Sequence, residues 1–349
     1  MYENYMKECF NLAKKGLGKT SPNPMVGCVV LDKNGNKISE GYHAKYGENH
    51  AERDALLKLK NGEEENGTII VSLEPCSHYG KTPPCVDLII ERKIKRVVFA
   101  MKDPNPVVSS IQKLQDNGIE VIYGVLEDEA KELNEIFITN MTEKRPFVAL
   151  KTATTIDGKI STKTGNSKWI TSVQARNKGH ELRNIYDAVL TTSSTVLADN
   201  PNFDNKLKIL VDRTLKVDFD KNFFKTGKII IVHDKKFIPK KFEDNVEYLP
   251  CSGINEKINI NELMQKLFEK NIMSIFVETG GTFNGSMIES GLVDKIYHFI
   301  APKILGDNSG KSAFDGRNIT EISNCINYKI QNIERIEEDI LITYKKAAE

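Results

Sequence analysis

Three short motifs in the N-terminal part of the chain place one histidine and two cysteines at the ends of predicted helices and strands. His50 begins a helical pattern, Cys76 follows the predicted strand 68–73, and Cys85 opens the next predicted helix after Pro84. One His and two Cys supply three ligands for a tetrahedral zinc ion and leave the fourth position for water. Thiolates and imidazole also suit the softness and charge of Zn²⁺. The motifs therefore predict one zinc site per chain.

Glu52 follows His50 by two residues, so on a helix its side chain points away from the direction of the histidine. This favours a role beside the water on the metal, whose pKa zinc lowers from about 15.7 towards 7. The pattern H-x-E followed by P-C-x-x-C is typical of zinc deaminases, in which this Glu moves protons. We therefore predict Glu52 as the catalytic proton shuttle of a deaminase.

The spacing of the two cysteines departs from that pattern, because eight residues separate them in place of two. A core histidine with two inert buried cysteines is the alternative interpretation. His78, inside the eight-residue insert, could compete as a metal ligand, although we favour substrate contact for it.

The length and net charge of the chain limit how many domains it has and what kind of substrate it acts on. A chain of 349 residues predicts two domains. The net charge is +1 and basic residues are spread along the chain, which disfavours a nucleic-acid substrate. No apolar run reaches the roughly 20 residues of a membrane span, and the N-terminus lacks a signal-peptide pattern. We therefore expect a cytoplasmic protein with reduced cysteines, acting on a small molecule rather than on nucleic acid or a membrane.

Strand and helix patterns alternate along the whole chain, which predicts an α/β fold with a mixed or parallel sheet between helices. Residues 127–143 read as one long helix, and Lys144-Arg145-Pro146 interrupts the pattern before a new strand over 147–153. We place the domain boundary there and predict domains 1–145 and 146–349. Further strands are expected at 188–190, 208–211, 228–232, 274–277, 328–333 and 339–344, and helices at 263–270 and 283–290.

Four segments together resemble one family. They are Thr-Ser-Pro-Asn-Pro-Met-Val-Gly (20–27), His-Ala-Glu (50–52), the segment 73–85 with its long insert, and Ala-Met-Lys-Asp-Pro-Asn-Pro (100–106). The chain resembles, over essentially its whole length, the bifunctional pyrimidine deaminase and uracil reductase of riboflavin biosynthesis. The resemblance implies a cytidine-deaminase-like three-layer α/β/α domain followed by a dihydrofolate-reductase-like α/β domain that uses NADPH.

The resemblance also implies a substrate, a diaminopyrimidinone that bears a phosphoribosylamino group. Carried over by position, the residues that line the pyrimidine pocket would be Asn23, His43, His78, Lys81, Asp103 and Asn105. Ordinary roles compete with these: the Pro-flanked asparagines are typical turn residues, Lys81 could be a solvated cation, and His43 a strand histidine. After Pro106 the chain lacks the family's Gly-rich turn, which puts the contacts of that loop in question.

The second domain has weaker motifs of its own. A strand, a glycine turn and a helix start at 278–283 could bring backbone amides to a phosphate, although a tight connection explains the turn equally well. The resemblance implies hydride transfer to C1 of the ribose, with Lys151 positioning or polarising the sugar. It also implies nucleotide contacts from Ala153, Trp169, Thr171, Thr195, Asp199, Gly280, Gly281 and Thr282, and substrate contacts from Ser167, Arg183, Phe203, Lys206 and Glu278.

Alternatives remain open for this domain. Trp169 could fill the core and Arg183 could be a surface charge. Lys206 stands where the family usually has Arg, which loses the planar fork that grips phosphate, and Thr279 replaces a usual Gly. A competing hypothesis is a zinc nucleoside or tRNA deaminase whose second domain binds NADP(H) without catalysis. One amino-acid sequence does not determine the oligomeric state, and a homo-oligomer is compatible with it.

Overall fold

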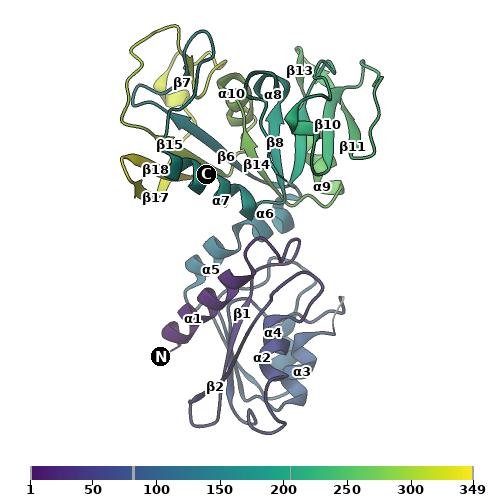
Figure 1. Cartoon of the computed structure of the whole chain (residues 1–349). Helices are drawn as coiled ribbons and strands as arrows, with labels where there is room; N and C mark the ends of the chain where they lie inside the picture. The colour runs from purple at the N-terminus through teal and green to yellow at the C-terminus, as the bar shows by residue number, and fades with distance from the viewer. Residues whose placement is uncertain (1, 81–82, 205, 348–349) are drawn as a thin grey trace. The chain divides into compact units, whose positions relative to one another are not determined.

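The computed structural model describes residues 2–80, 83–204 and 206–347, so Lys81 lies outside the described residues. The chain divides into two compact units, Met1–Lys144 and Arg145–Glu349 (Figure 1). Lys144 ends the last helix of the first unit in a left-handed conformation. The next residue, Arg145, forms a buried bidentate ion pair with Asp294 of the second unit. The units therefore separate between these two consecutive residues.

Five strands of the described chain form the sheet of the N-terminal unit, in the order β2-β1-β3-β4-β5. They are β1 (Gly27–Leu31), β2 (Lys37–Tyr42), β3 (Thr68–Val71), β4 (Arg96–Phe99) and β5 (Glu120–Tyr123). β1 is antiparallel to β2 and β3, whereas β3, β4 and β5 are parallel. The helices are α1 (Glu3–Ala13, extended by the 3₁₀ turn Lys14–Gly16), α2 (Ala51–Leu56), α3 (Cys85–Glu91) and α4 (Ser110–Asp116).

Helices cover both faces of this sheet. Figure 1 shows α2, α3 and α4 on one face and α1 on the other, which makes three α/β/α layers. The central strands β1, β3 and β4 are buried except at Arg96, the first residue of β4, with Val30, Ile70 and Val98 fully inaccessible. Strands covered on both faces read as continuous apolar runs, which explains their sequences. Because β3 and β4 are parallel, their carboxyl ends open on one edge of the sheet.

The predicted single helix over 127–143 is wrong. The structure has two helices, α5 (Glu127–Leu133) and α6 (Glu135–Glu143), separated by Asn134. The buried Asn134 side chain accepts a hydrogen bond from the Met25 N–H at 2.8 Å and donates one to the Met25 carbonyl at 3.0 Å. This distant backbone partner holds Asn134 away from regular helix geometry, and the local periodicity carries no sign of it.

The main sheet of the C-terminal unit has nine described strands in the order β11-β10-β9-β8-β14-β6-β15-β18-β17. They are β6 (Phe147–Thr154), β8 (Ala188–Thr192), β9 (Leu207–Val211), β10 (Ile229–Asp234), β11 (Val246–Cys251), β14 (Ser274–Glu278), β15 (Lys295–Ile300), β17 (Tyr328–Ile336) and β18 (Asp339–Lys346). The strands from β11 to β15 in this order are parallel, and β18 and β17 are antiparallel additions. Two small ladders pair β12 (Gly253–Ile254) with β13 (Lys257–Ile258), and β7 (Lys159–Ser161) with β16 (Lys311–Ser312).

Four helices pack on this sheet in the described chain: α7 (Val173–Ile185), α8 (Ser193–Asp199), α9 (Ile260–Glu269) and α10 (Gly281–Glu289), with 3₁₀ turns at Asn222–Phe224 and Ile322–Asn324. Leu190 of β8 packs in one core with Leu263 of α9, whereas its neighbour Val189 packs in another with Val196 of α8. Alternate residues of one strand thus serve two cores.

The strands β11 and β15 were not predicted from the sequence. Pro250 interrupts the pattern of β11, and β15 carries Lys295 and His298 among its apolar residues. No helix in the described part of the chain is long and apolar enough to cross a bilayer.

Candidate active sites

Three soft side chains of the N-terminal unit converge at the carboxyl edge of its sheet. His50 is the N-cap of α2, Cys85 is the first residue of α3, and Cys76 follows β3. The His50 Nδ1 atom lies 3.4 Å from Cys76 Sγ and 3.6 Å from Cys85 Sγ. Among the His, Cys, Asp and Glu residues that the structure describes, these three form the group able to hold a metal ion. His78 is not part of that group.

The electrostatics of this cluster suit metal binding. A hydrogen bond from the Cys85 thiol, together with His50 and against the effect of burial, lowers the pKa of Cys76 to about 4. The Cys85 backbone N–H also donates to Cys76 Sγ at 3.3 Å. The hydrogen bond to Cys76, together with burial, raises the pKa of Cys85 well above its usual value, so Cys76 is the thiolate of the pair. Burial also raises the pKa of Cys28, which lies outside the cluster. Thiolate is the form of cysteine that binds metals, so the donor set fits zinc.

Glu52 lies beside the cluster on α2 and is 3% exposed. Burial, with a further contribution from the negative charge of Cys76, raises its pKa to about 7. A buried carboxyl group next to three metal-binding atoms has the position expected of a proton carrier.

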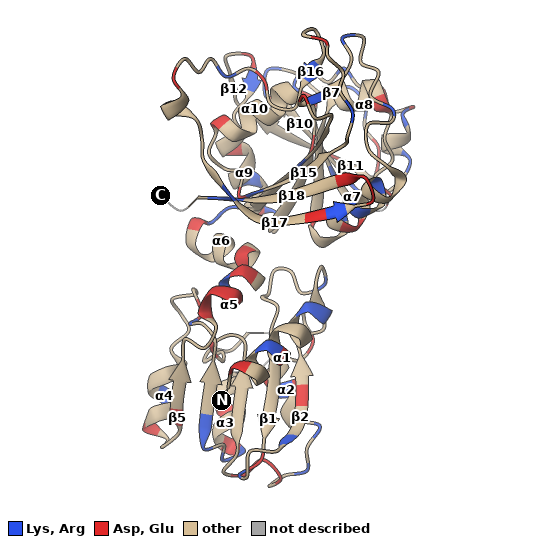
Figure 2. Cartoon of the chain, turned by 90° about the vertical axis from the view of Figure 1, so that its left-hand side faces the viewer, with Lys and Arg blue, Asp and Glu red and all other residues tan. Residues whose placement is uncertain are grey.

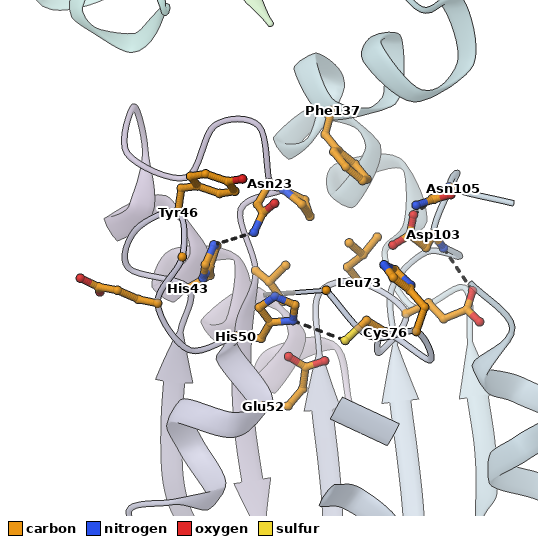
Figure 3. Close-up of a pocket in the computed structure, with 17 residues that line it drawn as sticks. Asn23, His43, Tyr46, His50, Glu52, Leu73, Cys76, Asp103, Asn105 and Phe137 are labelled. Carbon is orange, nitrogen blue, oxygen red and sulfur yellow. Dashed lines mark hydrogen bonds between the residues drawn. The ribbon is translucent and has the colours of Figure 1, made fainter. Parts of the chain in front are cut away.

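A cavity of about 460 Å³ opens above these residues. Figure 3 shows His50, Cys76 and Glu52 at its floor, with Asn23, His43 and Tyr46 on one side and Asp103 and Asn105 on the other. Five of the six residues expected in the pyrimidine pocket therefore line one cavity: Asn23, His43, His78, Asp103 and Asn105.

His43 is held in a defined protonation state. The Asn23 amide nitrogen lies 3.2 Å from His43 Nε2, and His43 Nδ1 lies 2.9 Å from the Asn49 carbonyl. An amide N–H can only donate and a carbonyl can only accept, so this arrangement requires a neutral ring with its proton on Nδ1. Burial lowers the pKa of His43, in agreement with this state. On the opposite wall, burial raises the pKa of Asp103 to about 6.

Several lining residues were not found from the sequence: Tyr46, Glu48, Leu73, Glu74 and Phe137. Tyr46 and Glu48 lie four and two residues before His50, so proximity along the chain was an available signal. Phe137 comes from α6, more than fifty residues beyond Cys85, and carries no local signal.

In the C-terminal unit, parallel pairing of β14 with β6 sets Glu278 opposite Lys151. The Lys151 ammonium lies 3.9 Å from one Glu278 carboxylate oxygen, and Arg183 Nε donates to the other at 2.5 Å. Arg183 is buried on α7, so the alternative of a surface charge is wrong. Its guanidinium also lies over the ring of Phe203, 4.7 Å from the centroid. Four residues predicted for this site thus form one connected group.

Lys206 has a different neighbourhood. Its ammonium donates to the backbone carbonyls of Asn184, at 3.0 Å, and Tyr186, at the carboxyl end of α7. Burial lowers its pKa. Cations are favourable at the carboxyl ends of helices, so this contact accounts for a lysine here without a ligand. Ser167 is half-buried and lies two residues before Trp169.

Three of the residues expected at the nucleotide, Gly280, Gly281 and Thr282, lie at the start of α10. Gly280 is the N-cap of α10, without a side-chain cap, and a Cβ atom there would meet open space. At Gly281 a Cβ atom would lie 2.1 Å from the Ser312 carbonyl oxygen, which restricts this position to glycine. Free backbone N–H groups at a helix start bind phosphates, so the segment Gly280–Thr282 fits a dinucleotide.

The remaining nucleotide residues lie on separate elements. Ala153 shares a side of β6 with Lys151, and Thr195 and the exposed Asp199 lie on α8. Trp169 is 61% exposed, so the alternative of a core residue is wrong. The guanidinium of Arg176 lies 4.2 Å from the centre of its indole ring and donates to the carbonyl of the buried Thr171. Thr279, in place of a glycine, donates to the Asn284 side chain.

Comparison with known families agrees with this division. Residues 1–101 match the cytidine and deoxycytidylate deaminase zinc-binding region, and residues 146–342 match the RibD C-terminal domain. The chain is 40% identical to the riboflavin biosynthesis protein RibD of Actinobacillus pleuropneumoniae, over 98% of this chain and 94% of that protein. It is 41% identical to RibD of Aquifex aeolicus, over 99% of this chain and 98% of that protein.

Solved structures extend the likeness to the fold. A diaminohydroxyphosphoribosylaminopyrimidine deaminase/5-amino-6-(5-phosphoribosylamino)uracil reductase from Thermotoga maritima is 39% identical, with a TM-score of 0.87 and 99% of both chains covered. RibD of Acinetobacter baumannii is 30% identical, with a TM-score of 0.88 and 99% of both chains covered. The chain therefore belongs to the RibD family of bifunctional riboflavin-biosynthesis enzymes, which join a zinc-dependent deaminase unit to an NADPH-dependent reductase unit.

Proposed function

We propose that the N-terminal unit hydrolyses the exocyclic amine of 2,5-diamino-6-(5-phosphoribosylamino)pyrimidin-4-one. The C-terminal unit then reduces the ribosyl group of the product to a ribityl chain. The observation that carries this proposal is the convergence of His50, Cys76 and Cys85 beside the buried Glu52, at the floor of a cavity with polar walls. The Thermotoga maritima protein, a pyrimidine deaminase and uracil reductase acting on phosphoribosylamino compounds, supports it, because this chain is similar to that protein over its full length.

In the deaminase site, we assign His50, Cys76 and Cys85 as the zinc ligands. When bound, zinc supplies the Lewis acidity that makes water a nucleophile near neutral pH. Glu52 takes the proton of the attacking water and passes it to the departing amine, so that ammonia leaves as a neutral molecule. Asn23, with the neutral His43 behind it, and the wall of Asp103 and Asn105 bind the polar edges of the pyrimidine. His78 and Lys81 complete this assignment from the insert.

In the reductase site, we assign Lys151 as the group that polarises the reacting sugar. NADPH supplies the hydride when bound. Reduction would place this hydride on C1 of the ribose and break the bond from C1 to the ring oxygen, which would take up a proton to become a hydroxyl group. Lys151 holds the oxygen in place, and Glu278 fixes the position of the ammonium. Ser167, Arg183, Phe203 and Lys206 are assigned to the substrate.

The nucleotide assignment rests on the glycine-containing turn between β14 and α10. Gly280, Gly281 and Thr282 would hold the pyrophosphate at the start of α10. The other proposed nucleotide contacts are Ala153, Trp169, Thr171, Thr195 and Asp199.

A small-molecule substrate agrees with the charge distribution. Figure 2 shows Lys and Arg interspersed with Asp and Glu over both units on the face in view, and the net charge is +1. Polynucleotide binding depends on clustered positive charge, so a nucleoside deaminase acting on tRNA is the weaker hypothesis.

Two assays on the purified protein test the proposal. Incubation with the diaminopyrimidinone ribotide should release one ammonia per substrate. Addition of NADPH should then consume the deaminated product, with loss of the near-ultraviolet absorbance of NADPH. Ammonia release combined with tight NADPH binding but no oxidation would favour a non-catalytic regulatory domain. Absence of ammonia release from zinc-loaded protein would contradict the deaminase assignment.

A further inference from the structure

Glu74 is a buried carboxylate beside the deaminase cavity that has no part in the metal cluster. It lies between β3 and Cys76 and is 6% exposed. Its backbone N–H donates to the Met101 carbonyl at 3.0 Å. The segment after β3 therefore stays hydrogen-bonded to the segment after β4 at this residue, and the Glu74 side chain reaches the loop that follows β4.

The two oxygens of this carboxylate bind opposite ends of that loop. Glu74 Oε2 accepts a hydrogen bond from the Asp103 N–H at 3.1 Å. Glu74 Oε1 accepts from the Ser110 N–H at 3.1 Å and from the Ser110 hydroxyl at 2.7 Å. Hydrogen bonds to an ionised acceptor are roughly twice as strong as neutral ones. One side chain thus closes residues 103–110 into a loop.

The loop carries one wall of the cavity. Asp103 and Asn105 line it, and each side chain binds the backbone of the same loop. Asp103 Oδ1 accepts from the Asn105 N–H at 2.8 Å, and Asn105 Oδ1 accepts from the Val107 N–H at 3.2 Å. The direction of both side chains therefore depends on where the loop backbone is anchored.

Within the described chain, a further hydrogen bond ties this backbone to the residue after Cys76. The Ser109 N–H donates to the Ser77 hydroxyl at 2.9 Å, and Ser77 is the residue after the ligand Cys76. Both attachments of the loop thus lie close to Cys76 in the chain, since Glu74 comes two residues before this cysteine and Ser77 directly after it. The distance between the cavity floor and the Asp103–Asn105 wall is set by this short stretch of chain.

We propose that Glu74 is a positioning residue of the deaminase, which holds the Asp103–Asn105 wall at the distance that the pyrimidine requires. The inference deepens the proposed deaminase function and rests on it. Loss of the Glu74 anchor lets the wall move while His50, Cys76, Cys85 and Glu52 keep their places. The defect therefore falls on substrate binding more than on the chemical step.

The test is the variant Glu74→Gln, which has the same shape but replaces one acceptor oxygen by an NH₂ group. That group faces an N–H donor, so one anchor of the loop is lost. We expect KM for the diaminopyrimidinone ribotide to rise about tenfold, equivalent to about 1.4 kcal/mol, with a smaller change in kcat. Zinc content should stay at that of the wild type, and amide hydrogen exchange should increase within residues 103–110.

Two further variants separate positioning from stability. Ser110→Ala removes the hydrogen bond from the Ser110 hydroxyl to Glu74 but keeps the one from the Ser110 N–H. It should therefore raise KM by a smaller factor than Glu74→Gln does. Glu64→Gln is the matched control, because Glu64 is a second buried glutamate of this unit, but it pairs with Arg92 and does not line the cavity. It should lower stability and leave KM unchanged.

The outcomes are distinguishable. Unchanged KM in Glu74→Gln, or an equal rise in Glu64→Gln, overturns the positioning role while the deaminase function stands. If Glu74→Gln does not fold, the KM of Ser110→Ala is the test, and an unchanged KM in that variant overturns the proposal. If the zinc-loaded wild type itself releases no ammonia, the proposed function fails and this inference falls with it.

Discussion

Glu278 and Lys151 occupy paired positions on the parallel strands β14 and β6, and the lysine ammonium lies 3.9 Å from the carboxylate. Arg183 binds the second oxygen of the same carboxylate. Although burial acts in the opposite direction, the charges of Lys151 and Arg183 lower the pKa of Glu278. The carboxylate therefore stays ionised and fixes two cations at the edge where substrate is expected.

Substitution of Lys151 by Met should separate the two activities. We expect the rate of NADPH oxidation to fall by two to three orders of magnitude, about the cost of removing one group that stabilises charge in a transition state. Ammonia release and NADPH affinity should be unchanged. Lys178→Met is the control, since Lys178 also pairs with a glutamate, Glu334 of β17, which lies outside the group around Glu278. Normal reduction by Lys151→Met protein would contradict its assignment.

Substitution of Glu52 by Gln should stop deamination while the protein keeps its zinc. The amide has the size of the carboxyl group but cannot carry the proton, so the rate should fall by about 10²–10⁴. Ammonia release and metal content are the measurements, with Glu48→Gln as a control at the exposed rim of the same cavity. Substantial ammonia release by Glu52→Gln protein would remove Glu52 from its proposed role.

Substitution of Cys85 by Ser should reduce bound zinc and abolish ammonia release. A neutral hydroxyl is a far poorer zinc ligand than a thiolate. Cys28→Ser provides the comparison, because Cys28 is equally buried in the same unit but lies outside the metal group. Metal analysis after dialysis against a chelator should show loss only in Cys85→Ser. Reduction of the deaminated substrate should continue, because it depends on the other unit.

Lys208 should make the stability of the C-terminal unit depend on alkaline pH. It is completely buried on β9, where it donates to the Phe223 carbonyl, and burial lowers its pKa from 10.5 to about 8. Between these two values the unfolded chain binds a proton that the folded chain has released. The free energy of unfolding should therefore rise with pH from about 8 to 10.5, by up to about 3 kcal/mol.

Fluorescence of Trp169, the only tryptophan of the chain, reports unfolding of this unit. Lys208→Met has a similar volume and no charge, so the pH-dependent difference from wild type should be confined to the same window. Equal pH profiles of the two proteins would show that Lys208 does not titrate in this range.

Much of the deaminase site could be predicted because its metal-binding and acidic residues lie in short sequence motifs. His50, Glu52, Cys76 and Cys85 each stand at the start of a helix or after a strand, and such positions are readable from periodicity and proline placement. The group found in the structure has the predicted members. The apolar runs of β1, β3 and β4 were equally readable, since strands covered on both faces need little else.

The rest depends on contacts between residues far apart in the chain. Asn134 breaks a regular helical pattern because it binds the backbone of Met25, 109 residues earlier. Glu74 looked like part of a cysteine motif, and only the fold brings Ser110 to it. The ammonium of Lys206 donates to the carbonyl of Tyr186 at the end of α7, a contact that no local pattern indicates.

The amino-acid sequence by itself determined the α/β class and predicted the cluster of His50, Cys76 and Cys85 that the structure contains, because these follow from short-range periodicity and the chemistry of each residue. Only the tertiary structure decided how Lys151 and Glu278 meet, since their pairing follows from the insertion of β14 between β8 and β6. The same holds for the anchor of the 103–110 loop. Such contacts lower the free energy through burial and hydrogen bonding across long separations, and no window of consecutive residues contains both partners.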